Sequence, residues 1–310
     1  MQIPSSRPYD VLVAGEINPD LILSGDVVPR FGQVEQLVDS ATLSIGSSSA
    51  IFSCGTSRLE LKTAFIGVCG DDLFGQFMLE EMTKRQVDVS PVIVDKSGQT
   101  GLSVNLNRGN DRAILTLVGC MVSLRADQVP DTLLAKTRHI HVASYFLQTA
   151  LQPGLPDLFR RARALGLTVS LDPNFDPSGE WRGFDELLSL VDVFLPNEKE
   201  ALGLTGAITV EQALAALARK CPTVAVKLGE RGAVAARGAE TASAEAIKME
   251  VVDTVGAGDS FDGGFLYAWL NGWNLERGLR LAAACGSLST RSAGGTNGQA
   301  TLEEALPYVD

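Results

Sequence analysis

The sequence predicts a three-layer α/β/α fold, in which helices cover both faces of a mostly parallel central sheet. Short apolar runs alternate with helical segments along most of the 310 residues, as is typical of parallel strands buried on both faces. Polar or glycine-rich residues follow several of these runs. Two β-rich segments, roughly 24–45 and 100–122, interrupt the alternation, and we expect them to form one small additional sheet.

Length and composition favour one large globular domain over residues 1–310. The chain is 45% hydrophobic and 20% charged, which is enough to bury a sizeable core. Its 26 Lys and Arg residues against 37 Asp and Glu residues give a net charge of −11. This balance argues against nucleic acid or an anionic membrane as a partner, whereas a nucleotide ligand needs only a local site.

Cysteine usage and the N-terminal segment indicate a cytoplasmic protein. The five cysteines are scattered, odd in number and never spaced as C-x-x-C, a pattern expected of reduced thiols. Residues 1–10 contain no apolar run after a basic cluster, and no stretch of 18 apolar residues occurs. We therefore expect neither a signal peptide nor a membrane span.

The first predicted strand, residues 9–15, is followed by the polar residues Glu16, Asn18 and Asp20. Polar groups just past the carboxyl end of a strand lie where α/β sheets bind ligands. A simple turn rich in Asn, Pro and Asp is nearly as good an explanation. Farther on, residues 33–38 and 41–45 suit short strands.

Small residues from 46 to 50 open the next predicted helix. Gly46-x-Ser48-x-Ala50 nearly matches the G-x-S-x-G nucleophile turn of hydrolases. That chemistry requires a histidine beside Ser48, and the only histidines, His139 and His141, lie two apart in an apolar run. The close approach of a ligand to the start of the helix is the better explanation.

After residue 123 strands and helices alternate regularly, with apolar strands expected at 167–172, 191–195 and 223–228. Each of these three strands ends in a polar or glycine-containing pair: Asp172 and Asn174, Asn197 and Glu200, and Lys227 and Gly229. Because parallel strands present their carboxyl ends at one edge of a sheet, we expect these pairs to form one composite site.

Asn197 and Glu200 also have a spacing that suits magnesium. Three residues apart at a helix start, they can face one direction and hold a hydrated Mg²⁺ through water, since this ion keeps several waters and few protein ligands. An amide N-cap followed by a helical glutamate explains the same pair equally well.

The most informative stretch is residues 253–264, which read DTVGAGDSFDGG. Gly256, Ala257 and Gly258 stand where a loop should turn into a buried helix, so unpaired backbone N–H groups would face an anion at the positive end of the helix dipole. Asp259 follows, and could take a proton from a hydroxyl group that attacks phosphorus. A glycine-rich turn with a capping aspartate is an equally weighted reading of this local pattern.

Residues 253–261 closely resemble the D-T-x-G-A-G-D-[ST]-F signature of the ribokinase-like, or PfkB, carbohydrate kinases. The resemblance extends over essentially the whole chain. Further matches are the early N-x-D pair at Asn18 and Asp20, the G-G-x-x-x-N region at 46–50, the G-x-x-G-x-D-x-x-G segment at 67–75, the N-x-x-E motif at 197–200 and the [TK]-x-G-x-x-G turn at 227–232.

The resemblance implies an ATP-dependent kinase that phosphorylates a hydroxyl group of a sugar or sugar derivative. Asp259 would be the general base, and the backbone N–H groups of Gly256, Ala257 and Gly258 would form the anion hole for the transferred phosphate. The residues implied in sugar binding are Asn18, Asp20, Gly46, Ser48 and Asn174. Those implied in nucleotide binding are Asn197, Lys227, Gly229 and Gly232.

The resemblance also implies ions and a partner. Asn197 and Glu200 would orient Mg²⁺ through water. Many members hold a monovalent cation such as K⁺ near residues matching Asp253 and Val255, and whether this chain uses one stays open. The segments 24–45 and 100–122 look like the family's lid, which often pairs with the lid of a second subunit, so we expect a homodimer.

The sequence departs from the family pattern where the sugar is contacted. Ser47 and Ile51 replace the second glycine and the asparagine of G-G-x-x-x-N, and Met121 replaces the asparagine of the lid motif G-A-N. The arginine that often follows D-P-N is missing, since Asp176 comes after Phe175. These changes leave the identity of the acceptor open.

Two alternatives to a sugar kinase follow from these departures. A nucleoside kinase on the same fold is favoured by the apolar Ile51 and Met121. A sugar-binding protein on a catalytically retired kinase fold is the second alternative, and the intact Asp259 argues against it.

Overall fold

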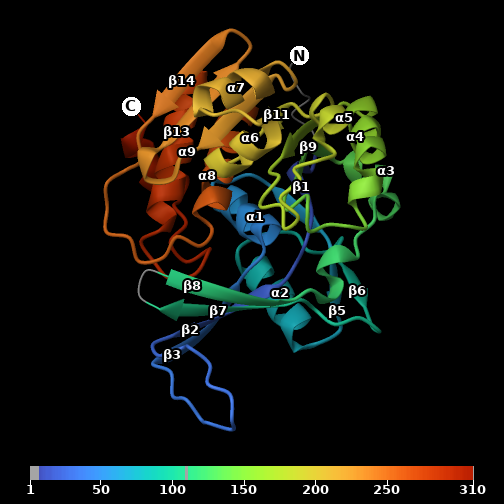
Figure 1. The fold of residues 1–310 in the computed structure, drawn as a ribbon. Helices are drawn as coiled ribbons and strands as arrows, with labels where there is room; N and C mark the ends of the chain where they lie inside the picture. The colour runs from blue at the N-terminus through green and yellow to red at the C-terminus, as the bar shows by residue number, and fades with distance from the viewer. Residues whose placement is uncertain (1–6, 109–110, 310) are drawn as a thin grey trace.

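The computed structural model describes residues 7–108 and 111–309 and contains a large sheet between two layers of helices, with a small sheet beside it (Figure 1). Residues 1–6, 109, 110 and 310, which fall in the predicted domain and β-rich segments, lie outside the described residues. The large sheet has the strand order β14-β13-β12-β11-β10-β9-β1-β4. Its strands are β1 (Tyr9–Ala14), β4 (Thr63–Ile66), β9 (Thr137–Val142), β10 (Thr168–Leu171), β11 (Val193–Phe194), β12 (Thr223–Lys227), β13 (Ala233–Arg237) and β14 (Glu240–Ala244).

The large sheet is mostly parallel, as predicted. The six strands from β4 to β12 pair in parallel, and β13 and β14 continue the sheet antiparallel as a hairpin. Parallel neighbours require crossover connections, which the helices supply. The carboxyl ends of β1, β10, β11 and β12 therefore meet at one edge of the sheet.

Alternate residues of each strand face the two helical layers. In β1, Leu12 packs into one core, while Val11 and Val13 pack into the other, because successive side chains of a strand point to opposite faces. The Leu12 side is covered by α3 (Asp131–Leu134), α4 (Leu155–Ala164), α5 (Phe184–Leu188), α6 (Glu198–Thr205) and α7 (Val210–Ala218). The opposite side is covered by α1 (Ser48–Arg58), α2 (Leu73–Lys84), α8 (Ala257–Leu270) and α9 (Leu275–Ser289).

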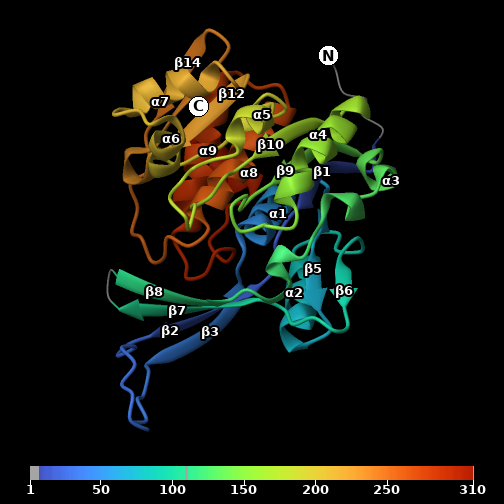
Figure 2. The same ribbon diagram turned by 45° about the vertical axis from the view of Figure 1, so that its right-hand side comes forward.

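The small sheet draws its strands from two distant parts of the chain. Its order is β3-β2-β7-β8, with β2 (Pro19–Ser24), β3 (Ser40–Ile45), β7 (Leu102–Arg108) and β8 (Asp111–Leu117). Strands β2 and β7 pair in parallel, and the two outer strands pair antiparallel with them. A separate parallel pair, β5 (Val68–Gly70) and β6 (Ile93–Asp95), lies beside the small sheet (Figure 2).

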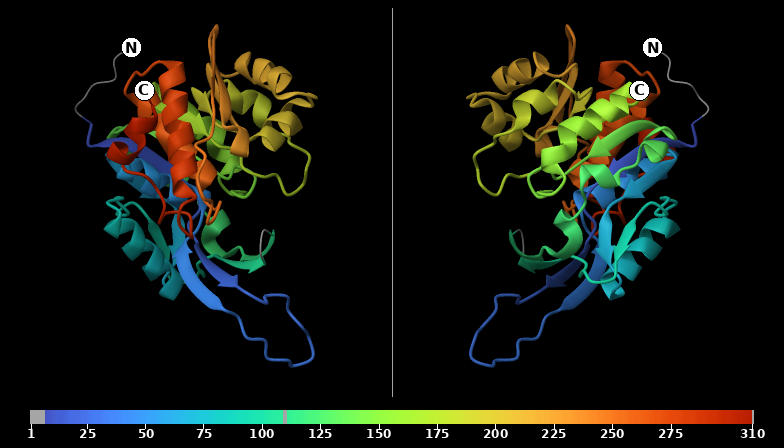
Figure 3. Two further views of the ribbon diagram at one scale, coloured as in Figure 1. Left: turned by 90° about the vertical axis from the view of Figure 1, so that its left-hand side faces the viewer. Right: turned by 90° about the vertical axis from the view of Figure 1, so that its right-hand side faces the viewer.

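The prediction of a strand at residues 33–38 is wrong. The chain from 25 to 39 is a loop that projects beyond β2 and β3 (Figure 3). In the described ranges no strand pairs with residues 33–38. The side chains of Val34 and Leu37 are 55% and 82% exposed. β-Propensity measures the fit of a side chain to a paired, half-buried surface, and the described residues provide no such surface at this loop.

Short elements complete the fold. They are α10 (Leu302–Ala305) and the 3₁₀ helices η1 (Gly119–Val122), η2 (Ala126–Gln128), η3 (Gln152–Gly154), η4 (Gly229–Arg231) and η5 (Leu306–Tyr308). In the part of the chain that the structure describes, no single helix is long and apolar enough to cross a membrane. Helices α6 and α7 would meet that criterion only as a pair, and they are bent by 66° relative to each other.

Candidate active site

The first turn of α8 places the predicted catalytic loop at the carboxyl edge of the large sheet. Gly256 caps the helix with a φ of 74°, a left-handed conformation that favours glycine. A Cβ there would also lie 2.7 Å from the Gly295 carbonyl oxygen and 2.9 Å from a methyl group of Ile51. Ala257 and Gly258 begin the helix, so their N–H groups belong to the first turn, where helices leave donors without intrahelical partners.

Asp259 lies in that same first turn, in a setting that disfavours its charge. Burial, helped by the nearby carboxylates of Asp172 and Glu16, raises the pKa of its carboxyl group to about 8. Lys227 and a hydrogen bond from Ser48 act in the opposite direction. A carboxylic acid that titrates near neutrality is suited to exchanging a proton with a substrate.

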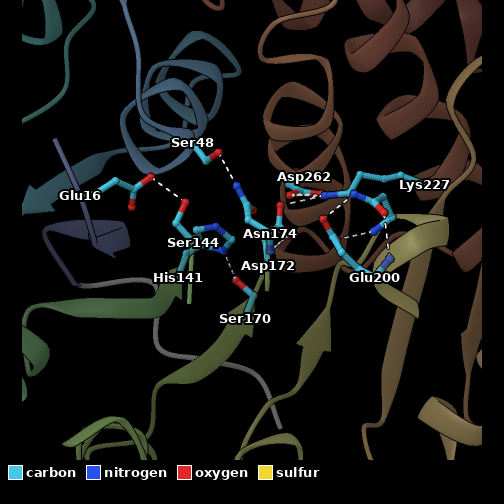
Figure 4. A network of polar contacts seen from close by, with 11 residues as sticks. Glu16, Ser48, His141, Ser144, Ser170, Asp172, Asn174, Glu200, Lys227 and Asp262 are labelled. Carbon is cyan, nitrogen blue, oxygen red and sulfur yellow. Dashed lines mark hydrogen bonds and ion pairs between the residues drawn. The ribbon is translucent and has the colours of Figure 1, made fainter. Parts of the chain in front are cut away.

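Lys227, at the end of β12, is the positive centre of the site (Figure 4). Its Nζ lies 2.8 Å from Asp172, at the end of β10, and 2.9 Å from Asp262, one turn along α8 from Asp259. Although burial acts against its charge, the carboxylates of Asp172, Asp262 and Glu200 hold the pKa of Lys227 above its usual value. The lysine is therefore charged.

One ammonium group cannot keep both of its carboxyl partners ionised. Burial opposes the charge of Asp172, but Lys227 and a hydrogen bond with Asp262 hold the pKa of Asp172 below its usual value. Burial raises the pKa of Asp262 well above its usual value, despite the contact with Lys227. We read Asp262 as the protonated partner, so the Lys227, Asp172 and Asp262 triad is close to neutral overall.

Asn197 and Glu200 form a reciprocal cap at the start of α6. The Asn197 side chain accepts from the Glu200 N–H (3.1 Å), and the Glu200 carboxylate accepts from the Asn197 N–H (2.7 Å). The capping interpretation of the pair is therefore confirmed. Burial and the neighbouring Asp172 also raise the pKa of Glu200 to about 7, so its charge is only partly balanced in this structure.

Asn18 and Asp20 lie where β1 leads into the small sheet. Both side chains are buried, and the Oδ1 of Asn18 has no hydrogen-bond partner among the described residues. Burial raises the pKa of Asp20 to about 6, against a hydrogen bond with Asn105. Position 46, beside these two residues, has no room for a side chain, because a Cβ there would lie 2.3 Å from an Asp20 carboxylate oxygen.

Ser48 and Asn174 meet across the site. Ser48 is the first residue of α1, and Asn174 follows β10 in a left-handed conformation with a φ of 52°. The Asn174 amide lies 2.6 Å from the Ser48 hydroxyl group, and Ser48 is near enough to Asp259 to act against the rise in the pKa of its carboxyl group. The structure thus brings Ser48, Asn174 and Asp259 together, although 211 residues separate Ser48 from Asp259 in the chain.

Glu16 is a buried carboxylate that the sequence analysis placed after the first strand but did not include among the predicted site residues. It accepts hydrogen bonds from the Ser49 hydroxyl (2.6 Å), the Ser49 N–H (3.2 Å) and the Ser144 hydroxyl (2.9 Å). Its position directly after the first strand was the available signal, but the partner Ser144 lies 128 residues away. Only the fold reveals that Glu16 joins the polar network around Asp259.

A cavity of about 820 Å³ opens beside the start of α8. Lys227, Gly229, Gly232, Ala257 and Gly258 line it, whereas Asn197 is not among its lining residues. Residues 246–249 and one face of α9 also line the cavity, which the sequence analysis did not predict. The small residues at 283, 286, 287 and 290 could have indicated this part of the lining, because their spacing puts them on one face of a helix.

Asp253 holds two loops together next to this cavity. Its carboxylate accepts from the N–H groups of Val255 (3.0 Å) and Gly294 (2.9 Å). Within the described ranges no group of three or more His, Cys, Asp or Glu side chains is arranged as a metal site.

The two apolar residues that favoured a nucleoside acceptor pack elsewhere. Ile51 is buried beneath the catalytic loop, against Gly256 and Gly295. Met121 is buried against Gly101. A hydrolase would also need a histidine that bonds to Ser48. The His141 ring instead stacks on Phe52, with the ring centroids 3.7 Å apart, and bonds to Ser170. These contacts give structural roles to Ile51, Met121 and His141.

Residues 10–302 match the model of the pfkB family of carbohydrate kinases. The chain is 30% identical over 285 residues to an ATP-dependent ribose-1-phosphate kinase from Halopiger xanaduensis, covering 92% of this chain and 93% of the relative. It is likewise 30% identical over 285 residues to a fructokinase from Klebsiella pneumoniae, covering 86% and 89%.

Solved structures show the same similarity. A candidate ribokinase II from E. coli, solved in complex with ATP and Mg²⁺, superposes with a TM-score of 0.86 at 25% identity, covering 97% of this chain and 99% of that one. A ribokinase from Arabidopsis thaliana, solved with ribose and ATP, gives a TM-score of 0.85 at 23% identity, covering 97% and 99%.

The raised pKa of Asp259 predicts a pH-dependent stability. Because its folded-state pKa of about 8 lies above the ordinary value of 3.8, the folded protein keeps a proton that the unfolded chain releases between these values. The free energy of unfolding should therefore fall as the pH rises from about 4 to about 8, by up to ~1.4 kcal/mol per pH unit.

Asp259→Asn removes this dependence, so its urea-unfolding free energy should fall less steeply than that of the wild type between pH 5 and pH 8. Glu200 and Asp20 titrate in both proteins and cancel in the comparison. Equal slopes for the two proteins would contradict the assigned environment of Asp259.

Proposed function

The chain belongs to the pfkB family of carbohydrate kinases and is an ATP-dependent carbohydrate kinase; from this premise we propose that Asp259 is its general base. The observation that carries the proposal is the position of Asp259 in the first turn of α8, between the large cavity and the polar residues that follow β1 and β10. Its raised pKa, about 8, suits a group that takes a proton from a hydroxyl.

In the proposed step, the acceptor hydroxyl gives its proton to Asp259 while its oxygen forms a bond to the γ-phosphorus of ATP. The bond between that phosphorus and the bridging oxygen breaks, and ADP leaves. The N–H groups of Gly256, Ala257 and Gly258 would stabilise the charge on the transferred phosphoryl group from the positive end of α8. Lys227, Gly229 and Gly232 line the cavity that we assign to the nucleotide.

We assign the cations to two places. Asn197 and Glu200 would orient a hydrated Mg²⁺ through water, a role that suits oxygen ligands at the edge of a phosphate site. Their mutual cap does not conflict with this role, because it fixes the Glu200 carboxylate in one position. Asp253 and Val255 would stand beside a monovalent cation such as K⁺, held by backbone oxygens.

We propose that the acceptor lies over Asn18, Asp20, Gly46, Ser48 and Asn174. Asn18 and Asp20 support a polyhydroxylated ligand, because one is a buried amide with an unused acceptor and the other a buried carboxylate. A nucleoside acceptor loses its support, since Ile51 and Met121 pack against other parts of the chain.

The small sheet is proposed to act as a lid over this acceptor and as a dimer interface. Asp20 belongs to β2 of that sheet, so movement of the sheet would carry a sugar contact with it. Strand β8 exposes Ile114, Leu115 and Leu117 to 51%, 60% and 44%, which suits cover by a second copy of the chain. The five cysteines are all free and buried, in keeping with the proposed cytoplasmic location.

Asp259→Asn tests the base directly. The acceptor is first identified by ADP release over a panel of sugars, sugar phosphates, sugar acids and nucleosides. With that acceptor, kcat should fall by at least ~10²-fold, the usual contribution of a general base. Asp262→Asn is the matched control, since an amide can replace the protonated Asp262 as a donor to Asp172, and it should stay within about tenfold of wild type. A smaller loss in Asp259→Asn than in the control would refute the assignment.

Glu200→Gln tests the magnesium role. It should lower kcat/KM for MgATP by about 10–100-fold, in the range reported for groups that orient a metal's surroundings, and should raise the Mg²⁺ concentration needed for half-maximal rate. Glu304→Gln is the control, because Glu304 closes the equivalent capping box with Thr301 in α10. An unchanged Mg²⁺ dependence in Glu200→Gln would leave the residue with its capping role alone.

The proposed dimer predicts that charged substitutions in the lid lower the mass of the protein in solution. The double variant Leu115→Lys and Leu117→Lys should shift the protein from dimer to monomer in light scattering, because two charges would be buried at the interface. Ile208→Lys is the control, since Ile208 is 88% exposed in the loop between α6 and α7. A monomeric wild type, or a dimeric double variant, would contradict the proposed interface.

A further inference from the structure

Two helices begin at the site, and the charged groups beside their first turns have opposite signs. Helix α8 begins beside Lys227, whose Nζ lies 3.7 Å from the place of a Cβ on Gly258. Helix α1 begins beside the buried carboxylate of Glu16. Because the start of a helix carries a partial positive charge, the lysine adds to that charge at α8, whereas the glutamate balances it at α1.

Glu16 is bonded to the residues on both sides of Ser48. Its carboxylate accepts from the Ser49 hydroxyl at 2.6 Å and from the Ser49 N–H at 3.2 Å. Its backbone carbonyl accepts from the Ser47 hydroxyl at 2.6 Å. Ser47 caps α1 with a φ of 66°, a positive value that residues other than glycine rarely adopt. Glu16 thus fixes the first turn of α1, including a strained residue.

The same carboxylate ties this turn to the loop after β9. It accepts from the Ser144 hydroxyl at 2.9 Å (Figure 4), and Ser144 also has a positive φ, of 53°. Glu16 is only 2% exposed, so it acts on a ligand through its charge and its neighbours rather than by contact. The N–H of Ser49 can only donate, and a donor of this kind favours an ionised carboxyl group. Glu16 is therefore a fixed negative charge at the start of α1.

We propose that Glu16 is a positioning residue that keeps anions away from the start of α1, so that the group bound over Ser48 is uncharged and phosphate is directed to the start of α8. The free N–H groups and the dipole of a helix start ordinarily favour an anion. At α1 the Ser49 N–H and the dipole are already balanced by Glu16. A hydroxyl group of the acceptor meets no such repulsion, and it can bond to the Ser48 hydroxyl.

Asp20 adds a second negative charge near the start of α1. A Cβ on Gly46, two residues before Ser48, would lie 2.3 Å from an Asp20 carboxylate oxygen. Burial raises the pKa of Asp20 to about 6, so most of these carboxyl groups are ionised at pH 7. An acceptor that carries a phosphate or a carboxylate group would therefore have to place it away from Ser48.

The inference rests on the proposed places of the nucleotide and the acceptor, and its test uses anion binding rather than catalysis. The full-length protein is saturated with Mg²⁺ and a non-hydrolysable ATP analogue, which occupies the start of α8. Inorganic sulfate is then titrated at low ionic strength by calorimetry. Glu16→Gln keeps the shape of the side chain and can still bond to Ser49, but it has no charge. It should bind sulfate at least about tenfold more tightly than the wild type, because the repulsion at the start of α1 is lost.

Further variants separate the charge of Glu16 from its packing. Ser144→Ala removes one donor to Glu16 and leaves the charge, so its sulfate affinity should stay within about threefold of wild type. Adding Ser48→Asp to Glu16→Gln returns a carboxylate to the start of α1 and should abolish the added sulfate binding, whereas adding Ser48→Asn, of the same size, should retain it. Glu16→Ala is a second uncharged variant with the same expected direction, should Glu16→Gln fail to fold.

Equal sulfate affinities of the wild type and the uncharged variant would overturn the inference. A gain in affinity that Ser144→Ala matches would do the same, because loosened packing would then account for it. So would a gain that Ser48→Asp leaves in place, since sulfate would then bind elsewhere. Should sulfate binding follow the expected order while Asp259→Asn retains kinase activity, the role of Glu16 stands and the assignment of Asp259 as the base fails. The two proposals therefore fail separately.

Discussion

The ion pairing of Lys227 is the interaction on which the site depends. Five carboxyl groups, those of Glu16, Asp172, Glu200, Asp259 and Asp262, are gathered at one edge of the sheet, and an isolated buried carboxylate cannot stay ionised at an acceptable free energy. Lys227 bonds to two of them and joins β12, β10 and α8 in doing so. Since its charge suffices for only one of these two partners, Asp172 is ionised, and the carboxyl group of Asp262 keeps its proton.

The same charge is available to a nucleotide. A Cβ on Gly258 would lie 3.7 Å from the Lys227 Nζ, so the ammonium group lies directly beside the first turn of α8. It also lines the cavity that faces this turn. Phosphate arriving at the helix start would therefore meet the helix dipole and the ammonium group together.

Features that depend on residues close together in the chain could be predicted from the sequence, whereas contacts between distant residues could not. The alternation of strands and helices and the glycine-rich turn before Asp259 follow from residues close together in the chain. The bond between Ser144 and Glu16 joins residues 128 positions apart, and the bond between Ser48 and Asn174 joins residues 126 positions apart, so no local pattern encodes them. Residues 33–38 do not form the predicted strand for a related reason, because a strand needs a partner and none of the described residues pairs with this loop.

The proposed acceptor site differs from the family pattern in the residues that can contact a hydroxyl group. Ile51 stands where the family pattern has an asparagine, yet it packs beneath the catalytic loop. The polar groups left near Asp259 on the acceptor side include Ser48 and Asn174, which also bond to each other. An acceptor hydroxyl that bonds to either residue would therefore compete with the bond between Ser48 and Asn174.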